Sequence, residues 1–170
     1  SEMCIRDSKT AVAIASGQNH TLLLTSEGQL LAWGDNSNGQ LGNASTADST
    51  LPVVVSVTSE MVGARFCSLA AWGNNSAALT ADGRVFAWGG NSNGQLGNST
   101  TTDSSVPLRV SGLLAGEVVT ALAMGGHQGG TPSASLYALT DAGSLYAWGI
   151  NYYGQLGDGT TVDSKVPLRV

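Results

Sequence analysis

The string A-W-G-D-N-S-N-G-Q-L-G-N at residues 32–43 decides the fold, because it occurs three times. The second copy, A-W-G-G-N-S-N-G-Q-L-G-N, occupies residues 87–98, and the third, A-W-G-I-N-Y-Y-G-Q-L-G-D, occupies residues 147–158. Self-similarity at a period of this length is the signature of a repeat architecture, in which each copy is one supersecondary unit. We therefore expect three structural units of the same kind.

The spacing around each copy is partly fixed. The tryptophans at 33, 88 and 148 are each preceded by Thr eight residues earlier and followed by Pro nineteen residues later, whereas the tryptophans themselves are 55 and then 60 residues apart. Fixed distances inside a variable period predict rigid units joined by connections of different length.

Each unit begins with two strand-sized segments. In the first unit they are residues 12–16 and 21–25, and the second segment recurs as residues 76–80 and 135–140. The first segments end at Gly17, Gly73 and Gly125. The strings S-E-G, A-D-G and D-A-G follow the second segments, and their glycines suit the left-handed position of a three-residue hairpin loop. We expect an antiparallel hairpin in each unit.

The next segment, Q-L-L-A-W, R-V-F-A-W or S-L-Y-A-W, is apolar on both faces. Because side chains alternate along a strand, Trp88 and Phe86 share one face, and Ala87 and Val85 share the other. A strand that is apolar on both sides needs a sheet on each side of it. The fourth segment, L-P-V-V-V or V-P-L-R-V, begins next to a proline, which predicts a strand start or a sheet edge because proline lacks a backbone donor.

These segments resemble the repeat of the regulator-of-chromosome-condensation family, whose signature runs from A-G-x-x-H through D-G-x-V-Y-x-W-G-x-N to G-Q-L-G. The resemblance implies an all-β fold, a β-propeller with about three four-stranded antiparallel blades of an incomplete ring that normally has seven blades. We expect the blades to span residues 11–55, 56–110 and 111–170. The structural signature of the repeat consists of Trp33, Gly34, Gly39, Trp88, Gly89, Gly94, Trp148, Gly149 and Gly154.

An incomplete ring has consequences for the visible chain. Two sheet faces would stay uncovered and expose apolar area, so we expect aggregation, oligomerisation or marginal stability. The remaining blades of the propeller would lie outside the sequence. The first eight residues, S-E-M-C-I-R-D-S, match no repeat and resemble the conceptual translation of a sequencing adapter. The alternative is a disordered polar tail.

Composition narrows the function. The chain has 42% hydrophobic and 11% charged residues with 23 glycines, which favours a globular all-β fold rich in tight turns. The net charge of -5 and only seven basic residues argue against nucleic acid as a partner. The sequence shows neither a membrane-spanning apolar run nor a signal peptide, so we expect a soluble segment with no membrane partner. Both a bacterial extracellular and a cytoplasmic location stay open.

Catalytic and metal-binding patterns are weak. His20 and His127 are the only histidines, and neither is accompanied by a carboxylate or cysteine cluster. In the family that the chain resembles, the histidine at the position of His20 is a hydrogen-bonded structural residue. The string D-N-S-N-G at Asp35 departs from a calcium loop, which needs Gly at its sixth and Glu at its twelfth position. We expect no catalytic residue, no metal and no cofactor, and we interpret Asn36, Asn91 and Asn151 as caps of backbone groups.

The functional hypothesis is a non-enzymatic scaffold for a protein partner. Recognition by propellers lies in their variable loops. The third unit has an inserted loop at residues 126–133, which makes His127, Gln128 and Thr131 the candidate binding residues. The resemblance implies two alternatives: a guanine-nucleotide exchange factor for a small GTPase, and an enzyme-inhibiting propeller.

Overall fold

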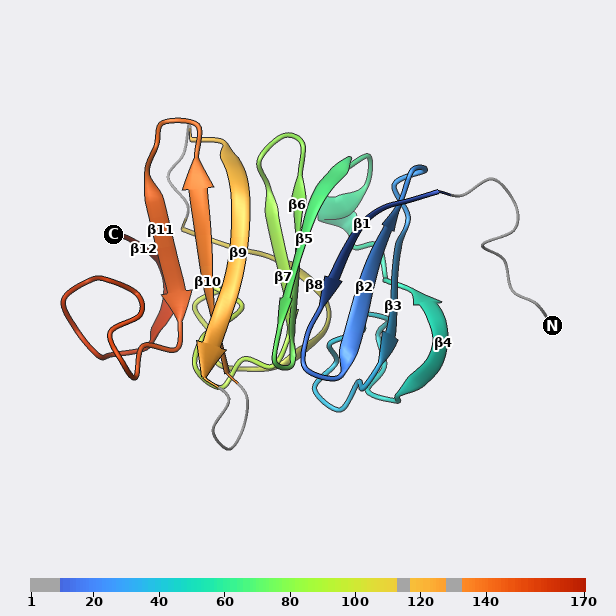
Figure 1. Ribbon diagram of the computed structural model, residues 1–170, viewed down its shortest axis with the longest axis horizontal. Helices are drawn as coiled ribbons and strands as arrows, with labels where there is room; N and C mark the ends of the chain where they lie inside the picture. Colours follow the sequence, from blue (N-terminus) through green and yellow to red (C-terminus); the bar gives the residue numbers. More distant parts are fainter. Residues whose placement is uncertain (1–9, 113–116, 128–132) are drawn as a thin grey trace.

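A computed structural model describes residues 10–112, 117–127 and 133–170, and within them the chain forms twelve β-strands and one single-turn 3-10 helix. The strands group into three four-stranded antiparallel sheets, which lie side by side in chain order (Figure 1). We call these sheets blades 1, 2 and 3. Blade 1 contains β1 (Ala11–Ser16), β2 (His20–Thr25), β3 (Leu30–Gly34) and β4 (Ser49–Val54). Blade 2 contains β5 (Phe66–Trp72), β6 (Asn75–Thr80), β7 (Val85–Gly89) and β8 (Ser104–Arg109). Blade 3 contains β9 (Val119–His127), β10 (Ser133–Thr140), β11 (Leu145–Gly149) and β12 (Ser164–Arg169).

The order within each blade follows the sequence, so every strand pairs with the next one along the chain. The first strands of the blades also contact one another, β1 with β5 and β5 with β9. The helix, Ser59–Met61, lies in the connection between blades 1 and 2. The predicted all-β architecture of antiparallel blades is confirmed.

The predicted hairpin between the second and third strands is present in all three blades. Gly28 has φ +81°, and its N–H donates to the carbonyl of Thr25 at 2.9 Å. The Thr25 hydroxyl accepts the N–H of Gln29 at 3.1 Å, which fixes the turn from inside. Gly83 and Gly143 have φ +82° and +78° in the equivalent turns. The Thr that recurs eight residues before each Trp therefore caps this turn.

The proline segment forms an edge strand in every blade, so of the two predicted placements, a strand start or a sheet edge, the edge is the one observed. β4 begins at Ser49, three residues before Pro52. The pairing with β3 is irregular there, since Ala32 pairs with Val53 while Gly34 pairs with Ser49. Pro52 falls inside this bulge of an edge strand, where no ladder hydrogen bond requires its missing N–H.

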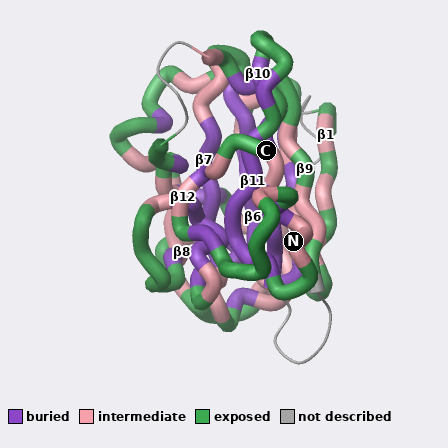
Figure 2. The backbone as a smooth tube through the Cα atoms, turned by 90° about the vertical axis from the view of Figure 1, so that its left-hand side faces the viewer, coloured by how far each residue is buried: buried purple, intermediate pink, exposed green. Residues whose placement is uncertain are grey.

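The core lies between the blades. Phe86 and Trp88 of β7 pack in one apolar cluster with Leu30 and Ala32 of β3. Tyr146 and Trp148 of β11 do the same with Val85 and Ala87 of β7. Figure 2 shows the buried residues in the middle of the molecule and the exposed ones in the surrounding loops. The alternation of large and small side chains on β7 thus serves two sheets at once, as the sequence predicts.

Two further predictions were not confirmed by the structure. The predicted end of the first strand of the third unit at Gly125 is wrong, since β9 continues to His127 because residues 126 and 127 pair with β10. The adapter-like residues 1–8 lie outside the described part of the chain. In the ranges that are described, the structure has no helix of the length and apolar character required to cross a bilayer.

Candidate interaction surface

The recurring asparagines hold the long loops between the third and fourth strands. The Asn36 side chain is fully buried, and its Nδ2 donates to the carbonyls of Ser45 and Ala47 at 2.9 and 3.0 Å. Its Oδ1 accepts the N–H of Leu41 at 2.9 Å. Asn91 makes the same kinds of bond in blade 2. The prediction that these residues cap backbone groups is confirmed, and their amides are not available to a ligand.

Most of the tryptophans and glycines of the repeat string lie where backbone segments or blades meet. Trp88 and Trp148 are fully buried, whereas Trp33 is half-buried. Gly34 has φ +110°, and a Cβ there would lie 2.2 Å from the carbonyl oxygen of Asn19. Gly89 and Gly149 have φ +102° and +98°, and Gly39, Gly94 and Gly154 have φ +80°, +80° and +74°. All of them except Gly154 serve the close approach of backbone segments, since a Cβ there would lie 2.2–2.6 Å from a backbone atom.

His20 is a buried link between two blades. Its side chain is 3% exposed, and its Nε2 lies 2.8 Å from the Ser76 hydroxyl. Because that hydroxyl donates to the Gln40 carbonyl at 2.7 Å, Nε2 is the donor and Nδ1 is the unprotonated nitrogen. Burial lowers the pKa of His20 to about 4, although Asp35 opposes the shift. His20 is therefore a neutral structural residue, out of reach of a substrate.

The described carboxylates make local contacts. The Asp35 carboxylate accepts the N–H of Ser37 at 2.9 Å and so closes a local turn. Within the described residues, no three side chains of His, Cys, Asp or Glu come together as a metal ion would need.

The hairpin of β9 and β10 is longer than its counterparts. Trp72 pairs with Asn75 as the last pair of the β5–β6 hairpin. In blade 3 the equivalent pair is Gly125 with Ser135, and two further pairs follow it, made by residues 126 and 127 with 134 and 133. Of the three candidate binding residues, His127 thus ends β9. Gln128 and Thr131 lie outside the described residues.

Trp72 borders this hairpin. It ends β5, and its indole Nε1 is buried with no hydrogen-bond partner among the described residues. A Cβ on Gly126 would lie 3.0 Å from that nitrogen, so the glycine allows the hairpin to approach the ring. The extension of the hairpin therefore rests against blade 2.

A second feature at this end of blade 3 is a pair of tyrosines in the β11–β12 loop. Tyr152 and Tyr153 are each 70% exposed, and their ring centroids lie 5.1 Å apart in an edge-to-face arrangement. Blade 1 has Ser37 and Asn38 at these positions. The loop and the β9–β10 hairpin project from the same end of blade 3 (Figure 1). We call Gly126, His127, Tyr152 and Tyr153 the interaction end. Sequence reasoning missed the tyrosines, although their replacement of Ser-Asn in the repeat string was a visible signal.

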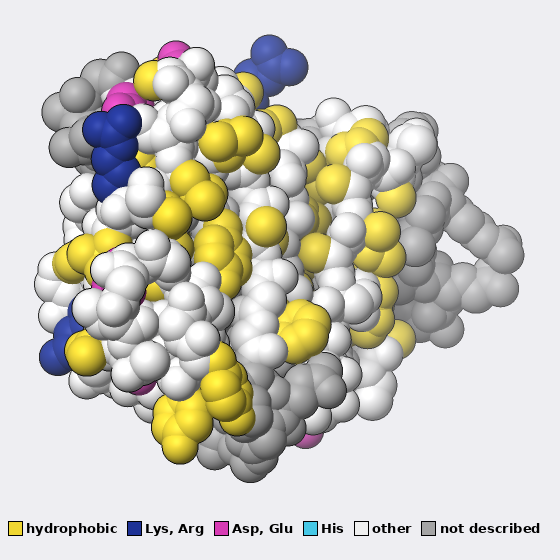
Figure 3. Space-filling model, turned by 60° about the vertical axis from the view of Figure 1, so that its left-hand side comes forward, with side chains coloured by type: hydrophobic (Ala, Val, Ile, Leu, Met, Phe, Trp, Pro, Cys, Tyr) yellow, Lys and Arg dark blue, Asp and Glu magenta, His cyan; other side chains and the backbone are white. Residues whose placement is uncertain are grey.

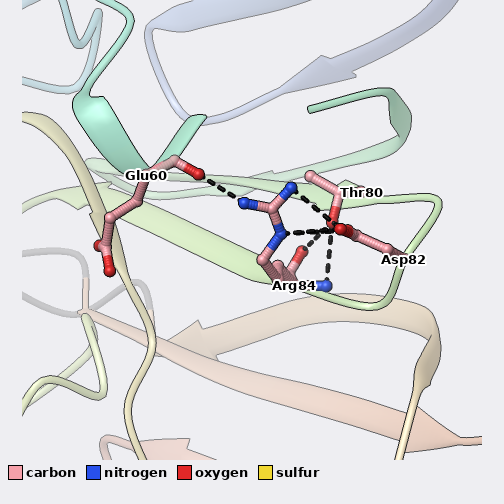
Figure 4. Close-up of polar contacts among 4 residues, drawn as sticks. All are labelled: Glu60, Thr80, Asp82 and Arg84. Atoms are coloured by element: carbon pink, nitrogen blue, oxygen red, sulfur yellow. Dashed lines mark hydrogen bonds and ion pairs between the residues drawn. The ribbon is translucent and has the colours of Figure 1, made fainter. Parts of the chain in front are cut away.

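The opposite end of blade 2 is fixed by an ion pair (Figure 4). The Arg84 guanidinium contacts the Asp82 carboxylate at 2.9 Å and donates to the carbonyl of Glu60 in the connection between blades. The hydrogen bonds from Arg84 and Thr80 lower the pKa of Asp82 to about 2. These contacts attach the β6–β7 turn to the helix, and thereby stabilise the blade junction.

Comparison with known proteins places this geometry among repeat propellers. Two family models described as the Regulator of chromosome condensation (RCC1) repeat match the chain, one over residues 11–40 and the other over residues 27–79, 82–128 and 142–170. The Ultraviolet-B receptor UVR8 of Arabidopsis thaliana is 38% identical over 92% of this chain and 33% of its own length. The human E3 ubiquitin-protein ligase HERC2 is 33% identical over 94% of this chain and 3% of its own length.

A solved structure gives the same result for the fold. The crystal structure of Prp20p from Saccharomyces cerevisiae superimposes with a TM-score of 0.78 at 24% identity, over 94% of this chain and 38% of that one. The chain therefore spans about a third of the receptor and of Prp20p, and a small part of the ligase.

Proposed function

Since the chain belongs to the regulator of chromosome condensation repeat family, we propose that it is a non-enzymatic protein-interaction scaffold that recognises its partner through the interaction end of blade 3. The lengthened β9–β10 hairpin carries this proposal. The third unit differs most from the other two at this hairpin, which has two additional strand pairs. Variable segments on a rigid scaffold are where binding residues are usually found.

The tyrosine pair supports the same surface. Tyr152 and Tyr153 expose large amphipathic rings in a loop at the same end of blade 3 as the hairpin, and tyrosine is enriched in protein interfaces because it adds contact area at a low cost in side-chain entropy. The family frame does not require them, since blade 2 has Ser92 and Asn93 there. Two independent departures from the repeat thus lie together at one end.

The buried polar groups support a non-enzymatic role. His20 is bonded to Ser76, and the Ser76 hydroxyl is bonded to Gln40, so neither is placed to act on a substrate. The relatives agree with a binding role, since Prp20p has binding properties to Gsp1p and histones. The likeness to Prp20p is one of fold, so it supports a protein partner in general and no particular one.

The test begins with affinity capture on the full chain, after which the captured protein is identified, purified and titrated directly. Three variants are compared with the wild type. In one, residues 126–134 are replaced by Gly-Asn, the turn of blade 2. In another, Tyr152→Ser and Tyr153→Asn restore the residues of blade 1. The matched control is Val62→Ser, which is 74% exposed at the opposite end of the blades.

We expect both changes at the interaction end to weaken binding by about tenfold or more, and Val62→Ser to leave it unchanged. A partner that binds all four proteins equally would show that the recognition surface lies elsewhere. Acceleration of nucleotide release from a captured small GTPase would favour an exchange factor, and inhibition of a captured enzyme would favour an inhibitor. Turnover of a substrate by the purified chain would contradict the proposal.

A further inference from the structure

Two polar atoms in the contact between blades 2 and 3 lack a hydrogen-bond partner among the described residues. They are Nε1 of Trp72 and Oδ1 of Asn75, and both are buried. On the side of the molecule that Figure 3 brings forward, polar groups lie open between the apolar side chains, where solvent can bond to them. Inside the contact an unbonded donor or acceptor costs free energy, because it has given up its bonds to solvent. These two atoms therefore indicate a polar binding site.

Trp72 and Asn75 face the same way. They lie directly opposite each other as the last pair of the β5–β6 hairpin, so their side chains are neighbours on one face of the sheet. Trp72 packs against the apolar cluster between blades 2 and 3, and Ala77, two residues after Asn75, belongs to that cluster. The unbonded donor and the unbonded acceptor are thus adjacent, and both are turned towards blade 3.

The amide of Asn75 is held from its other side. Its Nδ2 donates to the carbonyl of Gly90 in its own blade, and the side chain is 1% exposed. In blade 3 the hydroxyl of Ser135 donates to the Ile150 carbonyl in the same way. Serine is therefore sufficient for this bond, and Asn75 adds an oxygen that the bond does not use.

The contact between blades 1 and 2 fills the same positions with protein groups alone. Gly17 and His20 stand there in place of this pair, and the imidazole lies over the glycine, since a Cβ on Gly17 would be 2.1 Å from Cε1 of His20. The Nε2 of the ring then reaches the Ser76 hydroxyl of the next blade. Blade 3 has Leu136 in place of Ser76 and offers no hydrogen bond there. The second contact needs a different polar partner.

The β9–β10 hairpin brings a third polar atom to this place. A Cβ on Gly126 would lie 3.0 Å from Nε1 of Trp72 and 2.1 Å from the carbonyl oxygen of Ser133. The indole nitrogen and the carbonyl oxygen therefore border one point, although no hydrogen bond joins them. A water that makes hydrogen bonds of about 2.9 Å can bond to both. A carbonyl oxygen has two lone pairs, so it can accept this bond beside another.

We propose that one buried water molecule binds between blades 2 and 3. It accepts the Nε1–H of Trp72 and donates to Oδ1 of Asn75 and to the carbonyl oxygen of Ser133. About three hydrogen bonds are typical of a buried water in a protein. Because Ser133 belongs to the β9–β10 hairpin, the water attaches this hairpin to blade 2, as His20 attaches blade 1. The site lies wholly between two blades of this chain and does not depend on the proposed scaffold role.

NMR of the full chain labelled with ¹⁵N tests the site through the tryptophan N–H groups. We expect cross-peaks between water and Hε1 of Trp72 with opposite signs in NOE and ROE spectra, which distinguish a bound water from exchange of the hydrogen with solvent. Trp88 and Trp148 are internal controls in the same spectra. Their Nε1–H groups donate to the carbonyls of Gln40 and Gln95, so they should show no such peaks.

Three variants separate the ligands of the water. Asn75→Ser keeps a hydroxyl for the Gly90 carbonyl but removes Oδ1, so the Trp72 cross-peak should weaken. Trp72→Phe removes the donor and keeps most of the ring. Each of these changes should lower the folding equilibrium constant about tenfold, measured by urea unfolding. Ser133→Ala is the matched control, because it removes the hydroxyl and keeps the carbonyl, and it should leave the cross-peak unchanged.

The double variant, Trp72→Phe with Asn75→Ser, tests whether one water joins the two side chains. Either single change already releases the water, so the second change should cost less than about threefold in the folding equilibrium. Effects that multiply to about a hundredfold would mean that the two atoms bind nothing in common. Circular dichroism of each variant establishes that it is folded.

The outcomes are distinct. A folded wild-type chain without the Trp72 cross-peak overturns the proposal, and coupling of the two substitutions in that case would show a direct bond between their side chains. A cross-peak that Ser133→Ala abolishes comes from the hydroxyl and overturns it too. An unchanged cross-peak in Asn75→Ser overturns the role of Oδ1. A cross-peak specific to Trp72, kept in Ser133→Ala and weakened in Asn75→Ser, establishes the site.

Discussion

The two interfaces between blades use the same backbone frame but differ in what fills it. Between blades 1 and 2, the Ser76 hydroxyl accepts from His20 and donates to the Gln40 carbonyl, so polar groups cross the contact. Between blades 2 and 3, Leu136 occupies the position of Ser76 and is fully buried in the apolar cluster. In both interfaces a tryptophan Nε1–H donates to a main-chain carbonyl of the preceding blade, Trp88 to Gln40 and Trp148 to Gln95. The common contact therefore sets the geometry, and the neighbouring position is free to be polar or apolar.

The largest expected effect concerns the shared part. Trp88→Ala and Trp148→Ala should each lower the free energy of unfolding by about 3–5 kcal/mol, because each removes a fully buried aromatic side chain and leaves a cavity. Urea unfolding followed by circular dichroism measures both. Trp33→Ala serves as the half-buried control and should cost less. Clearly unequal losses for the two buried tryptophans would mean that the shared contact is not equivalent in the two interfaces.

Acid should weaken the first interface selectively. The pKa of His20 is about 4 in the folded chain and 6.5 in the unfolded chain, so the unfolded state binds more protons between these values. The free energy of unfolding should therefore fall by up to about 3 kcal/mol as the pH drops from 6.5 to 4. His20→Asn, which introduces the residue of blade 2 at this position, removes that component. Identical pH profiles of the wild type and His20→Asn would refute the assignment.

A smaller loss is expected from the hydroxyl that crosses the first interface. Ser76→Ala leaves the His20 Nε2–H and part of the Gln40 carbonyl without their partner, which should cost about 1–3 kcal/mol. The matched control is Ser135→Ala, which removes one hydroxyl bond to the Ile150 carbonyl within blade 3 and should cost about 1 kcal/mol. Thermal unfolding of both variants provides the comparison, and a larger loss for Ser135→Ala would reverse it.

The smallest effect lies at the rim. Asn93→Ala deletes the bond to Asp163 of the following blade, whereas Asn38→Ala deletes the equivalent bond to Asp103 and also the bond that its Oδ1 accepts from the Asn74 side chain. Substitutions near the surface change stability by about 0.5 kcal/mol or less, so we expect both midpoints to stay close to that of the wild type, with the larger shift for Asn38→Ala. A loss of more than 1.4 kcal/mol in the free energy of unfolding from either variant, roughly a tenfold change in the folding equilibrium, would show that the rim contacts are important in holding the blades together.

Much of the fold could be predicted because the three copies of the repeat can be compared with one another within one chain. The alternation of Phe86 and Trp88 with Val85 and Ala87 identifies a strand between two sheets, and the glycine of each hairpin turn has the positive φ that the turn requires. Strand boundaries were less predictable where hydrogen bonding is irregular. Pro52 marks a bulge in β4 and not its beginning, because an edge strand tolerates a missing donor in mid-course.

The candidate site was harder to predict for a physical reason. The bond between His20 and Ser76 joins residues in different units, and no pattern within one unit reveals it. The continuation of β9 to His127 depends on pairing with β10. The glycine-rich string at this place is typical of a loop, so the sequence did not predict that pairing. Tyr152 and Tyr153 were visible as an exception to the repeat, yet their exposure depends on the loop conformation.

The turns in which Gln40 and Gln95 accept the tryptophan N–H of the following blade also affect the chemical ageing of the protein. Asn38-Gly39 and Asn93-Gly94 are asparagine-glycine sequences, in which the glycine nitrogen can attack the side-chain amide and release ammonia. In the folded chain, the N–H of Gly39 donates to the Asn36 carbonyl at 2.8 Å and that of Gly94 to the Asn91 carbonyl at 2.9 Å. Both nucleophiles are thus held away from the amide. Deamidation at these two sites should therefore occur mainly while the turns are open, so its extent records how long the turns have been open.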